Sequence, residues 1–314
     1  MKLETAQISK IFKDKFSDRV LRILELTDKG FVNDVYVVET DQSRFIFRTG
    51  NENSLDEYEK EKWAATKASE NRVPTPNILE TGVFENQAYS IQAYVEGAEG
   101  RCLAGERLFI WRKLGEYAKQ IHRVKVGGCG LAFRDMTAGS SQNLWLKYLD
   151  YNIESLNERD ELLKLGVITR AQSHTIRENF ENLRTREFRF GLNHGDLSLK
   201  NTIIDRDETV HLIDWGSAEA SIVPHHDLIQ LLKMNLLENS PNDFELRAFC
   251  EGCKITAEEF NKMMPDLRVL LILRAFDKLR WAIDRKLANL HDYVTEAIMT
   301  VKKYQLNNEY EKQN

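Results

Sequence analysis

The chain has 314 residues, with 44 Lys and Arg, 49 Asp and Glu, and a formal net charge of −5. This length predicts one domain or two closely joined lobes, with a core that requires neither metal nor disulfide. The negative charge argues against binding of nucleic acid by phosphate neutralisation. The longest aliphatic run, residues 269–273, is too short to span a bilayer, and the charged N-terminal residues lack the apolar segment of a secretory signal. We expect a cytoplasmic monomer with no nucleic-acid or membrane partner.

The first hundred residues are rich in strand patterns. Strands are predicted at residues 22–26, 32–39 and 44–48, followed by a charged helix at 55–69. The two prolines in residues 73–76 exclude a helix there, and a hairpin follows at 83–94. Small residues at 97–100 then break the pattern. We therefore expect a strand-rich lobe of residues 1–97 and a second lobe of residues 98–314.

The second lobe is predicted to be mostly helical. Apolar residues recur at helical spacing in residues 106–124, and further helices are predicted at 141–157, 169–185, 228–237 and 267–290. One β interlude, residues 192–215, interrupts them. The chain is thus expected to form an α+β fold with a small β-rich lobe and a large helical lobe.

The β interlude carries a concentration of polar groups. Its two apolar runs should pair antiparallel about a turn centred between Asp207 and Glu208, which would place Asn201 opposite Asp214. Asp196 lies five residues before Asn201. Carboxylate and amide oxygens suit Mg²⁺, and a separate carboxylate can accept a hydroxyl proton. These are the parts of a phosphoryl-transfer site.

The polar motifs of the β interlude are similar to those of a known protein family. The segment from His194 through Asp196 to Asn201, followed by Ile213-Asp214-Trp215, resembles the catalytic and metal motifs of the aminoglycoside phosphotransferase and choline kinase superfamily. That superfamily has a two-lobed protein-kinase-like fold. Further similar segments occur in the same order over about residues 20–235: the turn at 30–36, the helix carrying Glu61, the segments at 73–82 and 94–97, the helix at 114–122, and Asp227.

The resemblance implies a role for each matched residue. Asp196 would be the general base, and Asn201 and Asp214 would hold the Mg²⁺ that bridges the ATP phosphates. His194 and Asp227 would support the catalytic loop. The nucleotide would be bound by a phosphate-covering turn, an Arg–Glu ion pair and a hinge. Because the hinge begins with the polar Gln92, GTP is an alternative to ATP. The residues implied for this are Gly30, Asn33, Arg48, Glu61, Gln92, Ala93 and Val95.

One departure concerns the third strand. The family often has a Lys there that contacts the nucleotide phosphates and pairs with the helix Glu, whereas this chain has Arg48. Arg is a rigid planar fork and Lys a point charge, so the exchange is not neutral, although Arg can still pair with Glu61 and bind phosphate bidentately. A nucleotide-binding regulatory module with little turnover is therefore an alternative to an active kinase.

The acceptor is expected to be a small molecule. Gly195 precedes Asp196 where a protein kinase has Arg, and only 13 positions separate Asp214 from Asp227, which leaves no room for an activation loop. An antibiotic, aminoglycoside-like or other, is the leading acceptor class, and a metabolic compound of the choline or amino-sugar type is the alternative. Candidate acceptor-binding residues, which could equally form an ordinary solvated face, are Glu219, Asp277, Trp281 and Asp284.

Overall fold

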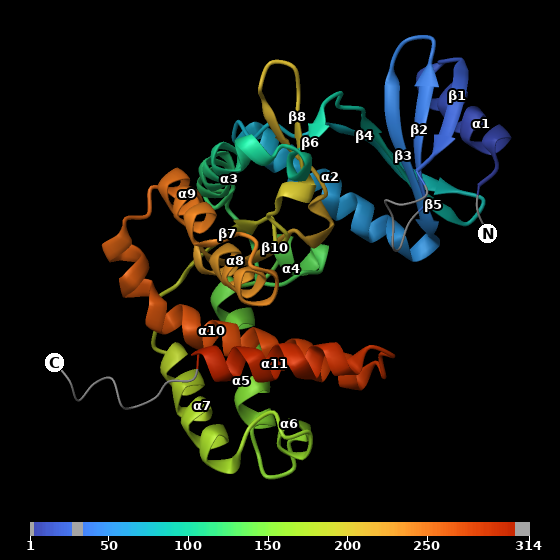
Figure 1. The fold of residues 1–314 in the computed structure, drawn as a ribbon. Coiled ribbons are helices and arrows are strands. Elements are labelled where there is room, and N and C mark those ends of the chain that lie inside the picture. Colours follow the sequence, from blue (N-terminus) through green and yellow to red (C-terminus); the bar gives the residue numbers. More distant parts are fainter. Residues whose placement is uncertain (1–2, 27–33, 305–314) are drawn as a thin grey trace.

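The computed structural model of the chain describes residues 3–26 and 34–304. The predicted phosphate-covering turn with Gly30 and Asn33 lies outside the described residues. Figure 1 shows a β-sheet at one end of the molecule and a larger group of helices at the other. The predicted two-lobed α+β fold is therefore confirmed.

The small lobe is built on a five-stranded antiparallel sheet in the order β1-β2-β3-β5-β4. Its strands are β1 (Val20–Glu25), β2 (Asp34–Thr40), β3 (Arg44–Asn51), β4 (Ile78–Phe84) and β5 (Gln87–Ala93). Burial alternates along β3, so Phe45 and Phe47 face one side and Arg48 the other. The sequence analysis did not predict α1 (Thr5–Phe16), whose Phe12 packs on both phenylalanines and closes a small hydrophobic core.

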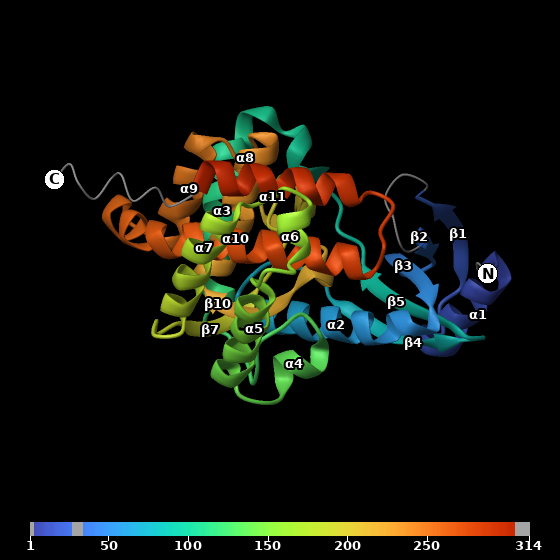
Figure 2. The ribbon, with the colours of Figure 1, turned by 90° about the horizontal axis from the view of Figure 1, so that it is seen from below.

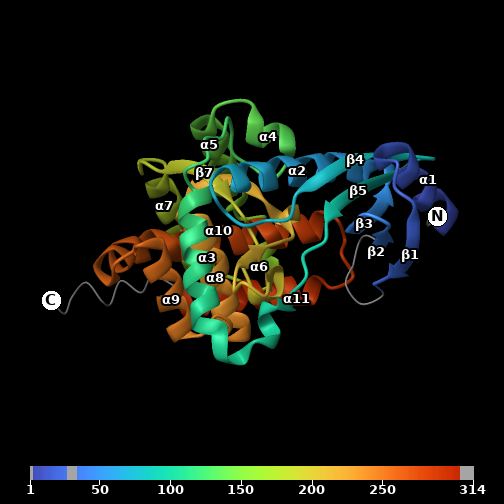
Figure 3. The ribbon, with the colours of Figure 1, turned by 90° about the horizontal axis from the view of Figure 1, so that it is seen from above.

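Helix α2 (Leu55–Glu70) lies against the opposite face of the sheet and extends toward the large lobe, as Figure 3 shows. Its residues Ala64, Ala65 and Ala68 are fully or almost fully buried, and they belong to the hydrophobic core of the large lobe rather than to that of the sheet. Small alanine side chains allow this close packing. By packing, α2 therefore joins the large lobe, although the predicted boundary at residue 97 assigns it to the small one.

The large lobe contains helices α3 to α11 and two small antiparallel sheets. In one sheet β7 (Arg189–Asn193) pairs with β10 (Glu219–Val223). The other has the order β6-β8-β9, with β6 (Ala98–Glu99), β8 (Thr202–Ile204) and β9 (Val210–Leu212). The helices are α3 (Arg107–Ile121), α4 (Phe133–Thr137), α5 (Ser141–Ser155), α6 (Glu161–Lys164), α7 (Arg170–Leu183), α8 (His225–Glu238), α9 (Asp243–Cys253), α10 (Ala257–Asp284) and α11 (Leu290–Tyr304).

Helices α10 and α11 lie side by side across the base of this lobe, as Figure 2 shows. The predicted helix at 267–290 differs from α10 at both ends. Thr256 and Glu259 form a capping box that starts α10 ten residues earlier, and Pro265 is accommodated inside the helix. In the described part of the chain, no helix combines the length and apolar character that crossing a membrane requires.

Helices α3 and α9 cross at backbone contact. A Cβ on Gly115 would lie 2.0 Å from the Phe249 carbonyl oxygen, and one on Gly252 would lie 2.0 Å from that of Arg112. The Cys253 thiol sits at this crossing and donates to the carbonyl oxygen of Gly115 at 3.2 Å. Each helix thus contributes one glycine that no larger residue can replace.

Candidate active site

The β8–β9 hairpin differs from the predicted register by one residue. Thr202 pairs with Leu212, and the amide of Ile213 donates to the Asn201 carbonyl oxygen at 3.0 Å, so Asn201 lies opposite Ile213 and not Asp214. The reason is the turn, where the Asp205 carboxylate accepts from the amides two and four residues later and centres the hairpin on residue 207. Asp214 follows directly in a left-handed conformation, with φ of 63° and ψ of 72°.

Asp196 lies in the loop between β7 and β8 and has one engaged and one free oxygen. Its Oδ2 accepts from Asn201 Nδ2 at 2.9 Å and pairs with Lys200 Nζ at 3.0 Å. Its Oδ1 has no hydrogen-bond partner among the residues that the structure describes. The side chain keeps 30% of its surface exposed, so this free oxygen can accept a proton from an incoming hydroxyl.

The predicted magnesium ligands supply oxygens of the required kind. Asn201 is buried, and its Nδ2 donates both to the main-chain oxygen of Asp196 at 2.8 Å and to the Asp196 carboxylate. Only the nitrogen can donate to two oxygens, so the amide Oδ1 is left as a ligand. The Asp214 carboxylate is exposed.

The donor set of one amide and one carboxylate fits Mg²⁺, which binds through few protein oxygens and completes its shell with substrate phosphates and water. Over residues 3–26 and 34–304, no group of three or more His, Cys, Asp or Glu is arranged to hold a metal.

Two buried residues hold the catalytic loop. The ring of His194 accepts at Nδ1 from the Asp196 amide at 3.3 Å and donates from Nε2 to the Ile213 carbonyl oxygen at 3.1 Å, the pattern of a neutral imidazole. Burial lowers the pKa of His194, which agrees with the neutral form. Asp227 accepts from the Gly195 amide at 3.2 Å and contacts His122 Nε2 at 2.9 Å. This geometry meets the requirements of the bracing roles predicted for both residues.

Gly195 is required by its backbone conformation. Its φ is +77°, and a Cβ there would lie 2.1 Å from the Ser217 carbonyl oxygen. The close approach brings the Asp196 loop against the segment that follows Asp214. A side chain at this position would push the loops that carry Asp196 and Asp214 apart.

Helix α2 meets the site through two neighbouring residues. Glu61 pairs with Arg48 of β3, with both guanidinium nitrogens facing both carboxylate oxygens, as the sequence analysis expected. Lys60, which the sequence analysis did not single out, donates to the Gly216 carbonyl oxygen at 2.6 Å. Arg48, Glu61 and the loop after Asp214 thus form one wall of the site.

The predicted hinge comprises the last two residues of β5 and the segment that follows it. Gln92 lies opposite Ile46 in the sheet register and is partly exposed. The Ala93 amide donates to the Asn77 carbonyl oxygen at 2.9 Å, and Val95 lies two residues beyond the strand. The positions of Gln92, Ala93 and Val95 at the lobe connection fit the predicted hinge, and their contact with a purine stays a prediction.

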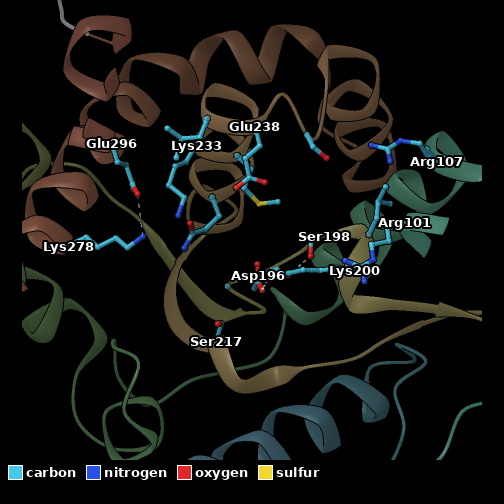
Figure 4. A pocket seen from close by; sticks show the side chains of 16 residues that line it. Arg101, Arg107, Asp196, Ser198, Lys200, Ser217, Lys233, Glu238, Lys278 and Glu296 are labelled. Atoms are coloured by element: carbon cyan, nitrogen blue, oxygen red, sulfur yellow. Dashed lines mark hydrogen bonds and ion pairs between the residues drawn. The ribbon is translucent and has the colours of Figure 1, made fainter. Parts of the chain in front are cut away.

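A cavity of about 590 Å³ opens beside Asp196. Figure 4 shows Asp196, Ser198 and Lys200 on one side of it and side chains of α8 and α11 on the other. Its charged lining residues are Arg101, Arg107, Asp196, Lys200, Lys233, Glu238, Lys278 and Glu296.

None of the four predicted acceptor-binding residues lines this cavity. Glu219 is buried and forms an ion pair with Arg274 at 2.8 Å. Burial alone would raise the pKa of Glu219, but the charges of Arg274 and His226 hold that pKa below its usual range. Its carboxylate is therefore already occupied, which corrects the expectation that it faces an acceptor.

The other three predicted residues lie along α10. Trp281 stacks under the Arg285 guanidinium, with 4.7 Å to the ring centroid, and Asp284 is exposed. Burial raises the pKa of Asp277, which lies near Arg274 and Asn152. Asp277 thus lies beside α5, whereas the Trp281 ring packs against Tyr293 of α11.

Sequence reasoning missed the basic residues of the cavity. Lys200 stands within the catalytic motif itself, and its spacing of four from Asp196 was the available signal. Lys233 is a lone lysine on α8, and Lys278 and Arg107 come from helices far apart in the sequence. Only the folded arrangement brings them together.

Comparison with solved structures shows a shared fold. A thermostable mutant of aminoglycoside phosphotransferase APH(4)-Ia, in ternary complex with AMP-PNP and hygromycin B, aligns over 96% of this chain and 100% of its own, with a TM-score of 0.69 and 14% identity. The GDP and kanamycin complex of APH(2")-IIIa aligns over 96% and 99%, with a TM-score of 0.62 and 15% identity.

A third solved structure is a Haemophilus somnus 129PT protein assigned as a fructosamine-3-kinase, which aligns over 96% and 97% of the two chains with a TM-score of 0.62 and 10% identity. No curated protein sequence matches at a significant level. The profile of the phosphotransferase enzyme family matches residues 24–258, three quarters of the chain, including Asp196, Asn201 and Asp214. The chain therefore belongs to the phosphotransferase enzyme family.

Proposed function

We propose that the protein is an ATP- and Mg²⁺-dependent kinase that phosphorylates a hydroxyl group of a small molecule. The observation that carries this proposal is the state of the Asp196 carboxylate. Its Oδ2 is held by Asn201 and Lys200, while its Oδ1 is free beside a cavity of about 590 Å³. A base oriented in this way can accept the proton of a hydroxyl as that hydroxyl attacks the terminal phosphate.

The remaining residues of the site would position the metal ion and the nucleotide. Asn201 and Asp214 would hold Mg²⁺, which supplies neutralisation of charge on the phosphates when it is bound. The Arg48 guanidinium, kept in place by Glu61, would contact the phosphates from the side of the sheet. Gln92, Ala93 and Val95 would face the base, with GTP as an alternative nucleotide. Few side chains suffice because phosphoryl transfer depends mainly on positioning and electrostatics.

Two acceptor classes have support. The hygromycin B and kanamycin complexes of the structural neighbours favour an antibiotic, and the neighbour assigned as a fructosamine-3-kinase favours a metabolic sugar derivative. All three share only the fold with this chain, because their identities are 10–15%. The chemistry of the cavity must therefore decide between the two classes.

The test is release of nucleoside diphosphate by purified protein with Mg-ATP or Mg-GTP, over a panel of antibiotics, amino alcohols and sugars. We expect acceptor-dependent release that falls at least about a hundredfold in Asp196→Asn, because removal of a positioned base costs roughly 10²–10⁴ in rate. Asp207→Asn is the matched control, since Asp207 lies exposed in the hairpin turn.

Full activity in Asp196→Asn would refute the mechanism. Tight Mg-nucleotide binding without turnover on any acceptor would instead favour a regulatory module.

A further inference from the structure

Lys233 of α8 is a cation without a counterion at the cavity. It lines the cavity together with Asp196, and Figure 4 shows its side chain directed into the open space. Among the residues that the structure describes, no carboxylate lies within ion-pair distance of its ammonium group, and it makes no hydrogen bond. Burial lowers the pKa of Lys233, and the positive charges of Lys278 and Arg274 lower it further. The more distant carboxylates of Glu296 and Asp196 raise it in part.

The other basic residues of the cavity differ from Lys233 because each has an acidic partner. Lys200 pairs with Asp196 at 3.0 Å and Lys278 with Glu296 at 3.4 Å. The two arginines pair with acidic residues outside the lining, Arg101 with Glu99 and Arg107 with Glu245. Arg274, which also lies near Lys233, pairs with Glu219.

The lining as a whole is basic. It contains five basic residues and three acidic ones, and two of the three acidic residues are those already paired with Lys200 and Lys278. The third, Glu238, lies exposed at the end of α8 and is not among the charges that act on Lys233. Among the described lining residues, an acceptor with several ammonium groups would find one unpaired carboxylate, that of the exposed Glu238, whereas an anion would find the partly buried, unpaired ammonium group of Lys233.

We propose that the acceptor carries an anionic group, a carboxylate or a phosphate, in addition to its reacting hydroxyl, and that Lys233 binds this group. The proposal rests on the proposed function, because it concerns the acceptor of that reaction. A partly desolvated ammonium costs free energy until an anion pairs with it, and the pair is then stronger than it would be in water. Lys233 would thus select among acceptors by charge and turn the hydroxyl toward Asp196.

The experiment compares sugars that share one ring and differ in charge: glucosamine, glucose, glucuronate and glucose 6-phosphate. Binding of each to the full chain with Mg-AMP-PNP is measured by calorimetry, and turnover is measured with Mg-ATP. We expect glucuronate or glucose 6-phosphate to bind at least tenfold more tightly than glucose and glucosamine. The member of the pair that binds better identifies carboxylate or phosphate as the anion.

Variants assign the preference to one side chain. Lys233→Met should remove the tenfold preference and leave the nucleotide dissociation constant unchanged, while Lys233→Arg should keep the preference. Lys302→Met, at an exposed lysine of α11 outside the cavity, is the control and should behave as the wild type.

Three results would overturn the proposal: tighter binding of glucosamine or glucose, a preference for anions that survives in Lys233→Met, or measurable binding of none of the four sugars. Weaker nucleotide binding in Lys233→Met would also overturn it, because Lys233 would then serve the nucleotide. Preference for an anionic sugar without turnover on any acceptor would count against the proposed kinase reaction and leave the charge selection by Lys233 standing.

Discussion

Removal of the Asp227 carboxylate should weaken both the fold and the reaction. In Asp227→Ala the Gly195 amide and the His122 ring both lose their hydrogen-bond partner. Both bonds are buried, because only 1% of the Asp227 side chain and 3% of the His122 side chain are exposed. Each buried donor or acceptor left without its partner costs about 1–3 kcal/mol, and two such bonds are lost here. With an unfolding entropy of roughly 2.1 cal/mol/K per residue over 314 residues, a loss of about 4 kcal/mol lowers the melting temperature by about 6 °C.

The chain offers a matched control in a second His–Asp contact. Asp205 meets His211 Nε2 at 2.8 Å, nearly the same distance as in the Asp227 pair, but 24% and 20% of these two side chains are exposed. Because exposed pairs contribute about 1 kcal/mol or less, His211→Ala, which leaves the Asp205 bonds to the turn amides in place, should lower the melting temperature by less than about 2 °C.

The assay combines thermal unfolding with steady-state kinetics. Asp227→Asn, which keeps an oxygen for the Gly195 amide, serves if the alanine variant does not fold. Displacement of the Asp196 loop by about 1 Å should lower kcat roughly a hundredfold in Asp227→Ala, with little change in the nucleotide KM. Equal melting shifts for Asp227→Ala and His211→Ala would refute the reasoning from burial, and an unchanged kcat would refute the bracing role.

Three further predictions concern the wall of the nucleotide site and the response to pH. Arg48→Lys should lower kcat/KM for ATP about three- to tenfold, because the lysine ammonium group is a point charge that cannot face both Glu61 oxygens. Higher activity in this variant would show that the arginine impairs the enzyme. Lys60→Met should raise the Mg²⁺ concentration needed for half-maximal rate, because the Gly216 carbonyl loses its donor, whereas Lys67→Met on the exposed face should not. Burial holds the pKa values of His194, His225 and His226 below the ordinary 6.5. The unfolded chain therefore takes up more protons than the folded one, and the denaturant midpoint of unfolding should fall as pH falls below about 6.5. A midpoint that stays constant between pH 7.5 and 5 would contradict this.

Local sequence was sufficient to predict that Asp196 and Asn201 lie together. Asp196 and Asn201 are five residues apart, and the structure joins them by the two hydrogen bonds of one amide group. A turn between two short apolar runs brought Asp214 near them. The register could not be predicted to one residue, because it depends on the Asp205 side chain, which captures two amides of the turn.

The acceptor side could not be predicted in the same way. Helical periodicity correctly placed Asp277, Trp281 and Asp284 on one face of α10, but periodicity does not say which neighbour that face meets. In the structure Asp277 lies near α5 and Trp281 packs against α11, and the cavity is lined instead by residues of α8, α10 and α11 that no short motif connects. Lys233 carries no signal in the sequence, because a lone lysine on a helix is ordinarily solvated.

The packing of α2 into the core of the large lobe has a consequence for local stability. The sheet and α1 keep a small core of their own, with Phe12 and Phe47 at its centre, while α2 and the loop carrying Asp214 belong to the larger core. The sheet can therefore open as a separate cooperative unit at a lower free energy than the catalytic loop. Amide hydrogen exchange should then be faster in β1–β3 than in β7 and α8, and a bound nucleotide, which contacts both units, should slow exchange chiefly in the sheet.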